Sequence, residues 1–139
     1  MRIFALFLLS LCLSLPAAAE RKHSIGSLDI HYSVFNSSFL QPDTAAATGL
    51  IRSRGQGVVN IAVLDAGKPS AATVSGSVRN LLGQETTLSF RQIREGEAIY
   101  YLAQFPLSSR EVLRFNIRVQ QPDGPAQTFS FNQEVFPDP

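Results

Sequence analysis

Two histidines are the side chains in this sequence with the best chemistry for holding a metal ion. His23 lies in the basic segment ERKH, and His31 lies in the segment LDIHYSVF. Imidazole binds copper and zinc, whereas the softer ligands are confined to Met1 and Cys12 in the first 19 residues. An amino-terminal copper site needs His at the third position of a mature chain, and His23 is the fourth residue of a chain beginning at Glu20. His23 and His31 are therefore candidate metal ligands, but we expect no resident cofactor.

A pair of arginines has the spacing of an anion clamp. Arg52 and Arg54 alternate with Ile51 and Ser53, so both guanidinium groups are expected on one side of an extended segment. Such a pair can hold a carboxylate or a phosphate through two parallel hydrogen bonds. The alternative, which the sequence favours, is a solvated strand edge whose charges discourage pairing with another chain.

The segment IREGEAIYYLAQF contains the residues closest to a hydrolytic arrangement. Glu95 and Glu97 form a carboxylate pair, and Tyr100 follows them. Glycoside hydrolysis requires two carboxylates fixed on either side of a cleft, whereas these two flank Gly96 in a turn. Neither histidine stands in a motif that would activate a serine nucleophile. A hydrolase is the third and least favoured hypothesis, and we expect a protein that is not an enzyme.

The amino-terminal residues determine where the protein is expected to function. Arg2 precedes the apolar run 3–15, and Ala17–Ala19 form a small-residue cleavage site. This pattern is typical of a signal peptide over residues 1–19, and the run is too short for a membrane span. We expect export to the periplasm and one domain over residues 20–139. That domain contains no cysteine, so its stability must come from a packed core.

The charge of the mature chain argues against some partners. Lys and Arg number 12 and Asp and Glu number 11 in the whole sequence, and removal of Arg2 makes the two equal. The charges are scattered along the chain rather than gathered in blocks. A nucleic-acid partner is therefore not expected, and neither is a membrane span after cleavage of the signal.

Alternation of apolar and polar residues predicts a series of short strands. The clearest segments are LDIHYSVF, QGVVNIAVL, TVSGSVRNLL, TTLSFRQI, AIYYLAQF, VLRFNIRVQ and QTFSFNQEVF. Tyr101 is expected in the core and Tyr100 on the outer face. A short helix that ends at Gly49 is expected in the linker after the first strand. Gly76 is expected to mark a bulge or the close approach of another backbone.

These segments predict an all-β fold, a single immunoglobulin-like β-sandwich of about seven antiparallel strands. The segment QGVVNIAVL is expected to form a hairpin with TVSGSVRNLL, and TTLSFRQI is expected to be one continuous strand. The Cys and Trp residues that mark antibody domains are absent from the expected domain.

Several segments together resemble a known family. HYSVFNSSFLQP, QGVVNIAVL, VSGSVRNLLGQ, REGEAIYYLAQFP and NQEVFPD are similar to DUF4426, a family of small exported Gram-negative proteins whose function is unknown. The resemblance implies a periplasmic β domain and brings no reaction, ligand or catalytic residue. A weaker resemblance, through Tyr101, Ala103, Phe105 and Leu107 followed by VLRFNIRV, is to immunoglobulin-like periplasmic domains associated with metal handling.

The favoured functional hypothesis is a non-enzymatic binding or protein-interaction module. Its partner would be an unknown periplasmic protein or a small ligand, bound through loops or an exposed sheet edge. The alternative is a periplasmic carrier of copper or zinc, or a metal-responsive domain, that uses His23 and His31.

Overall fold

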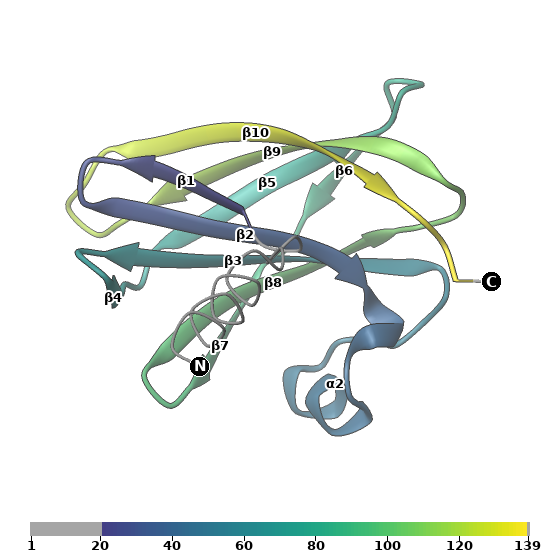
Figure 1. The fold of residues 1–139 in the computed structure, drawn as a ribbon, viewed down its shortest axis with the longest axis horizontal. Coiled ribbons are helices and arrows are strands. Elements are labelled where there is room, and N and C mark those ends of the chain that lie inside the picture. Colours follow the sequence, from purple (N-terminus) through teal and green to yellow (C-terminus); the bar gives the residue numbers. More distant parts are fainter. Residues whose placement is uncertain (1–20, 139) are drawn as a thin grey trace, which may run out of the picture.

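Two antiparallel sheets packed face to face form the protein (Figure 1). The computed structural model describes residues 21–138, so the predicted signal peptide lies outside the described residues. Sheet A has the order β1-β2-β3-β8-β7 with β4 beside β3, and sheet B has the order β10-β9-β5-β6. The predicted immunoglobulin-like β-sandwich is confirmed. The strands of sheet A are β1 (Arg21–Ile25), β2 (Leu28–Asn36), β3 (Gln56–Asp65), β4 (Lys68–Pro69), β7 (Arg91–Glu95) and β8 (Ala98–Pro106), and those of sheet B are β5 (Thr73–Arg79), β6 (Glu85–Leu88), β9 (Glu111–Gln120) and β10 (Ala126–Val135).

Alternation along each strand places one set of side chains between the two sheets. In β9 the residues at every second position from Leu113 to Val119 are buried, and those between them are exposed. Phe105 of sheet A meets Phe115 of sheet B edge-on at 5.3 Å between ring centroids, and Phe115 stacks on Phe131 at 5.0 Å. Tyr101 is buried as predicted, and its hydroxyl accepts a hydrogen bond from the Ala72 amide at 2.8 Å. The core is therefore an aromatic and aliphatic layer shared by both sheets.

The prediction of one continuous strand over TTLSFRQI is wrong. The chain leaves sheet B after Leu88 and enters sheet A at Arg91. Leu88 is buried and Phe90 is half-buried against the same core. Because the inner faces of both sheets point to that core, the alternation continues through a change of sheet.

Two further predictions about the strands need correction. The segment after β3 does not form the expected hairpin, because β3 turns into the short β4 and β5 then joins sheet B. The polar strand β1, which was not predicted, pairs with β2 at the edge of sheet A. Its residues lack a strong apolar alternation, and it is fixed by tertiary contacts instead.

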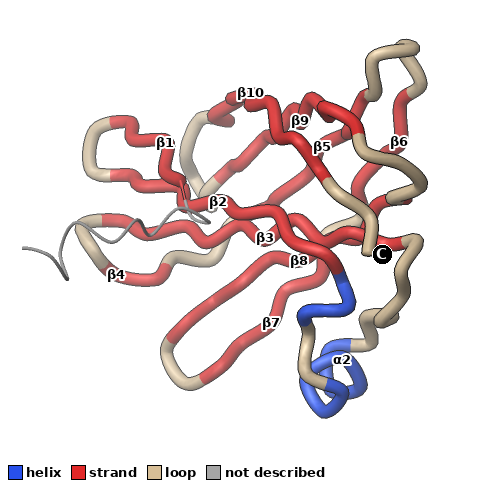
Figure 2. The backbone as a smooth tube through the Cα atoms, turned by 45° about the vertical axis from the view of Figure 1, so that its right-hand side comes forward, coloured by secondary structure: helices blue, strands red, loops and turns tan. Residues whose placement is uncertain are grey.

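A short helical segment follows the end of β2 (Figure 2), and Leu50 just after it packs on Val58 and Leu102 of the outer face of sheet A. The segment consists of a 3-10 turn, η1 (Ser37–Phe39), and the helix α2 (Pro42–Thr48). Gly49 ends the helix with a left-handed φ of 73°, as the sequence predicted. Arg91 of β7 donates hydrogen bonds to the carbonyl oxygens of Thr48 at 3.2 Å and Gly49 at 3.0 Å, and so anchors the end of the helix. Within the described range no helix is long and apolar enough to cross a membrane.

Candidate functional site

The loop that joins β5 to β6 exposes two adjacent leucines, and we call residues Asn80–Gln84 the leucine loop. Leu81 is 81% exposed and Leu82 is 85% exposed. The loop extends beyond the end of the sandwich (Figure 1). Exposed apolar side chains that lie next to one another, rather than singly, are a feature of interaction surfaces.

A network of hydrogen bonds holds the leucine loop in one conformation. The Oδ1 atom of Asn80 accepts from the amides of Leu82 at 3.0 Å and Gln84 at 2.9 Å. The Nδ2 atom of Asn80 donates to Gln84 Oε1 at 2.7 Å, and the Gly83 amide donates to the Asn80 carbonyl at 3.0 Å. Gly83 has a φ of 84°, a conformation that glycine adopts without strain. The two leucines are therefore presented on a well-defined turn. The leucine loop would lose little conformational entropy when a partner binds it.

Polar side chains cover the outer face of sheet B beside the leucine loop, and we call this surface the polar face. The strand register arranges them in rows that cross the sheet. The three central rows are Ser75, Arg118 and Thr128; Thr87, Ser77, Asn116 and Ser130; and Glu85, Arg79, Arg114 and Asn132.

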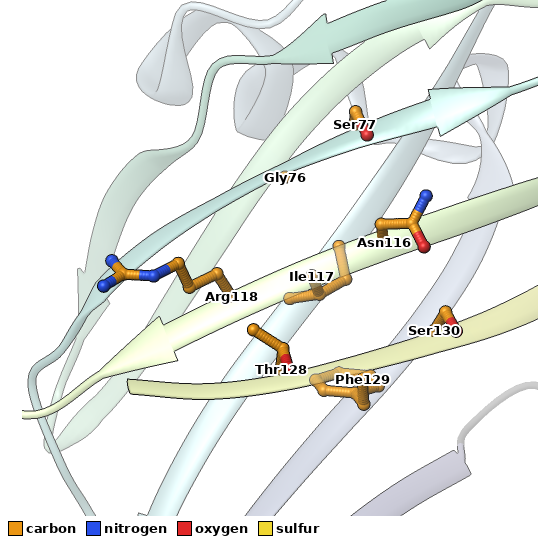
Figure 3. Close-up of a pocket in the computed structure, with 8 residues that line it drawn as sticks. All are labelled: Gly76, Ser77, Asn116, Ile117, Arg118, Thr128, Phe129 and Ser130. Atoms are coloured by element: carbon orange, nitrogen blue, oxygen red, sulfur yellow. The ribbon is translucent and has the colours of Figure 1, made fainter. Parts of the chain in front are cut away.

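The middle row of the polar face forms a shallow hollow of about 380 Å³. Figure 3 shows Ser77, Asn116 and Ser130 from three neighbouring strands, with Arg118 at one side. Gly76 lies beneath the hollow, where a Cβ atom would come within 2.4 Å of the Asn116 carbonyl oxygen. The predicted close approach of another backbone at Gly76 is thus confirmed. Short side chains and a glycine leave the hollow between rows that carry arginines.

The arginines of the polar face differ in their partners. Arg79 forms an exposed ion pair with Glu85 at 2.8 Å. Arg114 donates to the Ser130 hydroxyl at 3.0 Å. Arg118 makes no side-chain hydrogen bond or ion pair with the rest of residues 21–138. The face therefore carries a positive charge and offers guanidinium groups, hydroxyls and an amide to a ligand.

His23 lies on the inner side of β1 rather than in a metal-binding group. Its ring stacks on Phe129 with 4.8 Å between centroids and an interplanar angle of 12°. It is opposite Ile30, whereas His31 is the next residue along β2 and faces the outer side of sheet A. The two predicted ligands thus lie on opposite faces of one sheet. In the part of the chain that the structure describes, no three His, Cys, Asp or Glu residues come together as a potential metal site.

Arg52 and Arg54 lie in an irregular loop between α2 and β3, not on a strand. Both are exposed. Arg52 donates to the Ser38 carbonyl oxygen at 3.3 Å, and Arg54 lies close enough to Asp138 to act on its carboxylate. The structure brings the pair near the carboxyl-terminal tail, so a carboxylate of the protein itself occupies the neighbourhood of the predicted anion clamp.

Two carboxyl groups have pKa values below the ordinary 3.8. Hydrogen bonds from Ser38 and Asn36 lower the pKa of Asp138, and the charge of Arg54 adds to them. Hydrogen bonds from Gln121 at 3.0 Å and Ser27 at 2.8 Å lower the pKa of Asp65. Both groups join segments that are distant in the sequence, which identifies them as structural contacts.

The residues of the hydrolase hypothesis lie at the β7–β8 hairpin. Glu95 and Glu97 are exposed at its turn, where Gly96 has a φ of 60°. Tyr100 is half-buried on the outer face of sheet A, opposite Ile93 rather than beside the glutamates. The predicted outward position of Tyr100 and the predicted turn are confirmed.

Sequence reasoning misses the leucine loop and the rows of the polar face as functional residues. Composition alone indicates a turn at Leu82, and alternation within β9 indicates only a solvated strand face. The predicted strand TVSGSVRNLL ends at Arg79 in the structure, so its two leucines belong to the loop; the signal for the loop is these adjacent leucines followed by Gly83. The rows depend on strand register, which alternation within one strand does not contain.

Comparisons with solved structures place the fold among related proteins. A DUF4426 family protein from Pseudomonas aeruginosa PAO1 is 52% identical, with a TM-score of 0.83 over 89% of this chain and 100% of that one. FetP from uropathogenic Escherichia coli strain F11 is 11% identical, with a TM-score of 0.67 over 87% of this chain and 96% of that one. A copper-bound variant of the same FetP is 10% identical, with a TM-score of 0.66 over 87% of this chain and 92% of that one. The two FetP structures share the fold.

The family comparison agrees with the resemblance drawn from the sequence. A search of the curated proteins found no match. The model of the domain of unknown function DUF4426 matches residues 22–138, nearly all of the part that forms the sandwich. The chain belongs to the DUF4426 family.

Proposed function

We propose that this protein is a non-enzymatic interaction module of the periplasm that binds another protein through the leucine loop and the adjoining polar face. The observation that carries the proposal is the fixed exposure of Leu81 and Leu82 on a hydrogen-bonded turn. Most exposed apolar side chains occur singly on a protein surface, whereas these two are adjacent and held by a network. The expected partner has an apolar pocket that receives the leucines.

The arginines beside the leucine loop predict the charge of the partner surface around that pocket. Arg79 directly precedes the loop and lies opposite Arg114 in the register of β5 and β9. Arg118 is four residues beyond Arg114 on the same strand face, a separation of about 13 Å at the usual rise of a strand. Guanidinium groups pair with carboxylates through two hydrogen bonds. The partner surface around the pocket is therefore expected to be acidic.

The expected complex is weak and sensitive to salt. Exposed ion pairs contribute about 0–1 kcal/mol each, so the arginines direct the partner more than they hold it. Burial of both leucines would supply most of the affinity, at about 1.5–3 kcal/mol for each fully buried side chain. These magnitudes correspond to a transient association.

A photo-crosslinking residue in place of Leu82 tests the proposal in periplasm that contains the mature protein. We expect a defined protein adduct that is lost when Arg79 and Arg114 are both replaced by Glu, and that weakens as salt is raised. The matched control is the same crosslinker at Phe39, another exposed apolar position, which lies on η1. Adducts that are the same at both positions, or that are indifferent to the charge reversal, would contradict the proposal.

Metal carriage is the second candidate, favoured by the fold that this chain shares with the copper-bound variant of FetP. The imidazoles of the described residues are His23 on the inner side and His31 on the outer side of sheet A. Calorimetric titration with Cu²⁺ and Zn²⁺ separates the candidates. Binding tighter than that of a disordered His-containing peptide, and lost in the variant His23→Ala with His31→Ala, would favour the carrier.

A further inference from the structure

Sheet A divides into two branches, and a groove lies in the fork between them. On the edge away from β2, β3 pairs with β8 from Gln56 to Ile61 and with β4 at Leu64 and Asp65. The first residues of β8, from Ala98 to Tyr100, pair with β7 alone. Figures 1 and 2 show the β7–β8 hairpin leaving the direction of β3 and β4. We call the space on the outer side of this divergence the fork groove.

The fork groove has apolar walls and an aromatic end. Its volume is about 220 Å³, and the residues that line it include His31, Ala62, Leu64, Pro69, Ala98 and Tyr100. The register places His31 directly opposite Ala62, and Tyr100 lies one residue before the partner of Ile61. The small side chain of Ala62 thus lies between two rings, which gives the groove its depth.

A polar recess of about 40 Å³ adjoins the aromatic end of the groove and shares three of its residues, His31, Ala62 and Tyr100. Asn60 and Ser33 also line it. The Oδ1 atom of Asn60 is buried and has no hydrogen-bond partner within residues 21–138. A buried acceptor left unsatisfied costs about 1–3 kcal/mol, so a rotation of the Asn60 amide that brings this atom to a donor in the recess is favoured.

Beyond the recess, the outer face of sheet A carries a small buried cluster. Val58 lies two residues before Asn60, and Leu102 two residues after Tyr100, on the same outer face. Both pack with Leu50 in this cluster. Leu50, which follows α2, covers that part of the face, whereas no residue of α2 lines the fork groove. A ligand that enters the groove therefore meets a wall with one polar acceptor at its end.

We propose that the fork groove binds a single aromatic ring that carries a hydroxyl group, with the hydroxyl donating to Asn60 Oδ1. The groove is somewhat larger than an engineered cavity of about 150 Å³ that accepts benzene, so one ring with a small substituent fits. The aromatic residue Tyr100 lines both the groove and the recess, so a ring in the groove lies beside it while the hydroxyl enters the recess. The site lies on the opposite sheet from the leucine loop and is independent of the proposed function.

Such a phenol group has two sources, a free small molecule or a tyrosine side chain of another protein. Binding of p-cresol and of toluene to the mature protein, followed by the amide NMR signals of Ala62, Ala98 and Tyr100, tests the shared chemistry. We expect saturable shifts with both, and an affinity for p-cresol about five- to tenfold higher, because only p-cresol supplies the donor. N-acetyltyrosinamide and N-acetylphenylalaninamide form the second matched pair. If only p-cresol and toluene bind, the source is a free phenol. If N-acetyltyrosinamide also binds more tightly than N-acetylphenylalaninamide, the site also accepts a tyrosine side chain of a protein.

Two variants keep the test falsifiable. Asn60→Leu removes the acceptor with little change of size and is expected to abolish the preference for p-cresol. Ala98→Phe fills the groove from the edge of the hairpin and is expected to abolish binding of both compounds, with thermal melts confirming that each variant is folded. Absence of saturable shifts, equal affinity for p-cresol and toluene, or a preference that persists in Asn60→Leu would overturn the proposal.

Discussion

Arg21 is a single side chain that joins the two sheets at their edge strands β1 and β10. Its guanidinium carbon lies 5.0 Å from the ring centroids of both Tyr32 in sheet A and Phe131 in sheet B. It also donates to the Asn132 carbonyl at 3.2 Å and to Gln133 Oε1 at 2.9 Å. Cation–π contacts of exposed arginines are worth about 0.5–1 kcal/mol each. The unpredicted strand β1 is therefore held by this residue and by the stacking of His23 more than by its own propensity.

Asp138 makes the attachment of the carboxyl-terminal tail dependent on pH. Asn36 donates to its Oδ1 atom at 2.9 Å and to the Phe136 carbonyl at 2.7 Å. The pKa of Asp138 is lowered in the folded protein, so its contribution to stability is complete above the unfolded pKa and is lost as pH falls through the folded pKa. An NMR titration is expected to give Asp138 a midpoint below 3.8, with release of residues 136–138 at the same pH.

The variant Asp138→Asn is the control for that titration. It is expected to keep a neutral tail contact and to remove the transition of residues 136–138. A midpoint at or above the ordinary value would show that the hydrogen bonds from Asn36 and Ser38 do not hold the carboxylate.

At the scale of the elements, Gly76 allows β5 and β9 to approach under the polar face. In Gly76→Ala the new Cβ would meet the Asn116 carbonyl oxygen at 2.4 Å, and backbone cannot move aside as a side chain can. We expect a loss of about 1–3 kcal/mol in the free energy of unfolding, measured by urea denaturation. Gly55→Ala is the matched control, since its Cβ would have only Ser53 Oγ nearby at 3.8 Å. Equal stability of the two variants would contradict this account.

The elements that alternation predicts well are those with one buried face. The strand from Glu111 to Gln120 appears where expected. The helix that Gly49 ends also appears where expected, but its signal is the terminating glycine rather than alternation. The change of sheet between Leu88 and Arg91 is missed because both inner faces point to one core, so the pattern does not record which sheet a residue joins. Likewise, the sequence indicates the types of polar residue on β5, β9 and β10, but their rows depend on register across strands that are distant in the chain.

At the scale of the whole molecule, Phe115 connects the two layers. Its ring is fully buried and contacts Phe105 of sheet A and Phe131 of sheet B. Phe115→Ala is expected to lower the free energy of unfolding by about 3–5 kcal/mol, because the ring's buried contacts are lost and a cavity remains between the sheets. Phe39→Ala, at a side chain that is 75% exposed, is the control and is expected to change it by less than about 0.5 kcal/mol. Comparable losses in the two variants would show that the core does not centre on Phe115.

The repeated passage of the chain between the sheets has a consequence for biosynthesis. A chain that emerges amino-terminal end first delivers β3 long before β8, its neighbour on the other side. During that interval β3, with its valines and isoleucine, has an unpaired edge where β8 will later pair. The last strand to be synthesised is β10, at the edge of sheet B. Such delayed pairing slows folding and invites self-association. The nascent polypeptide is therefore expected to depend on a holding chaperone until its final strand is free.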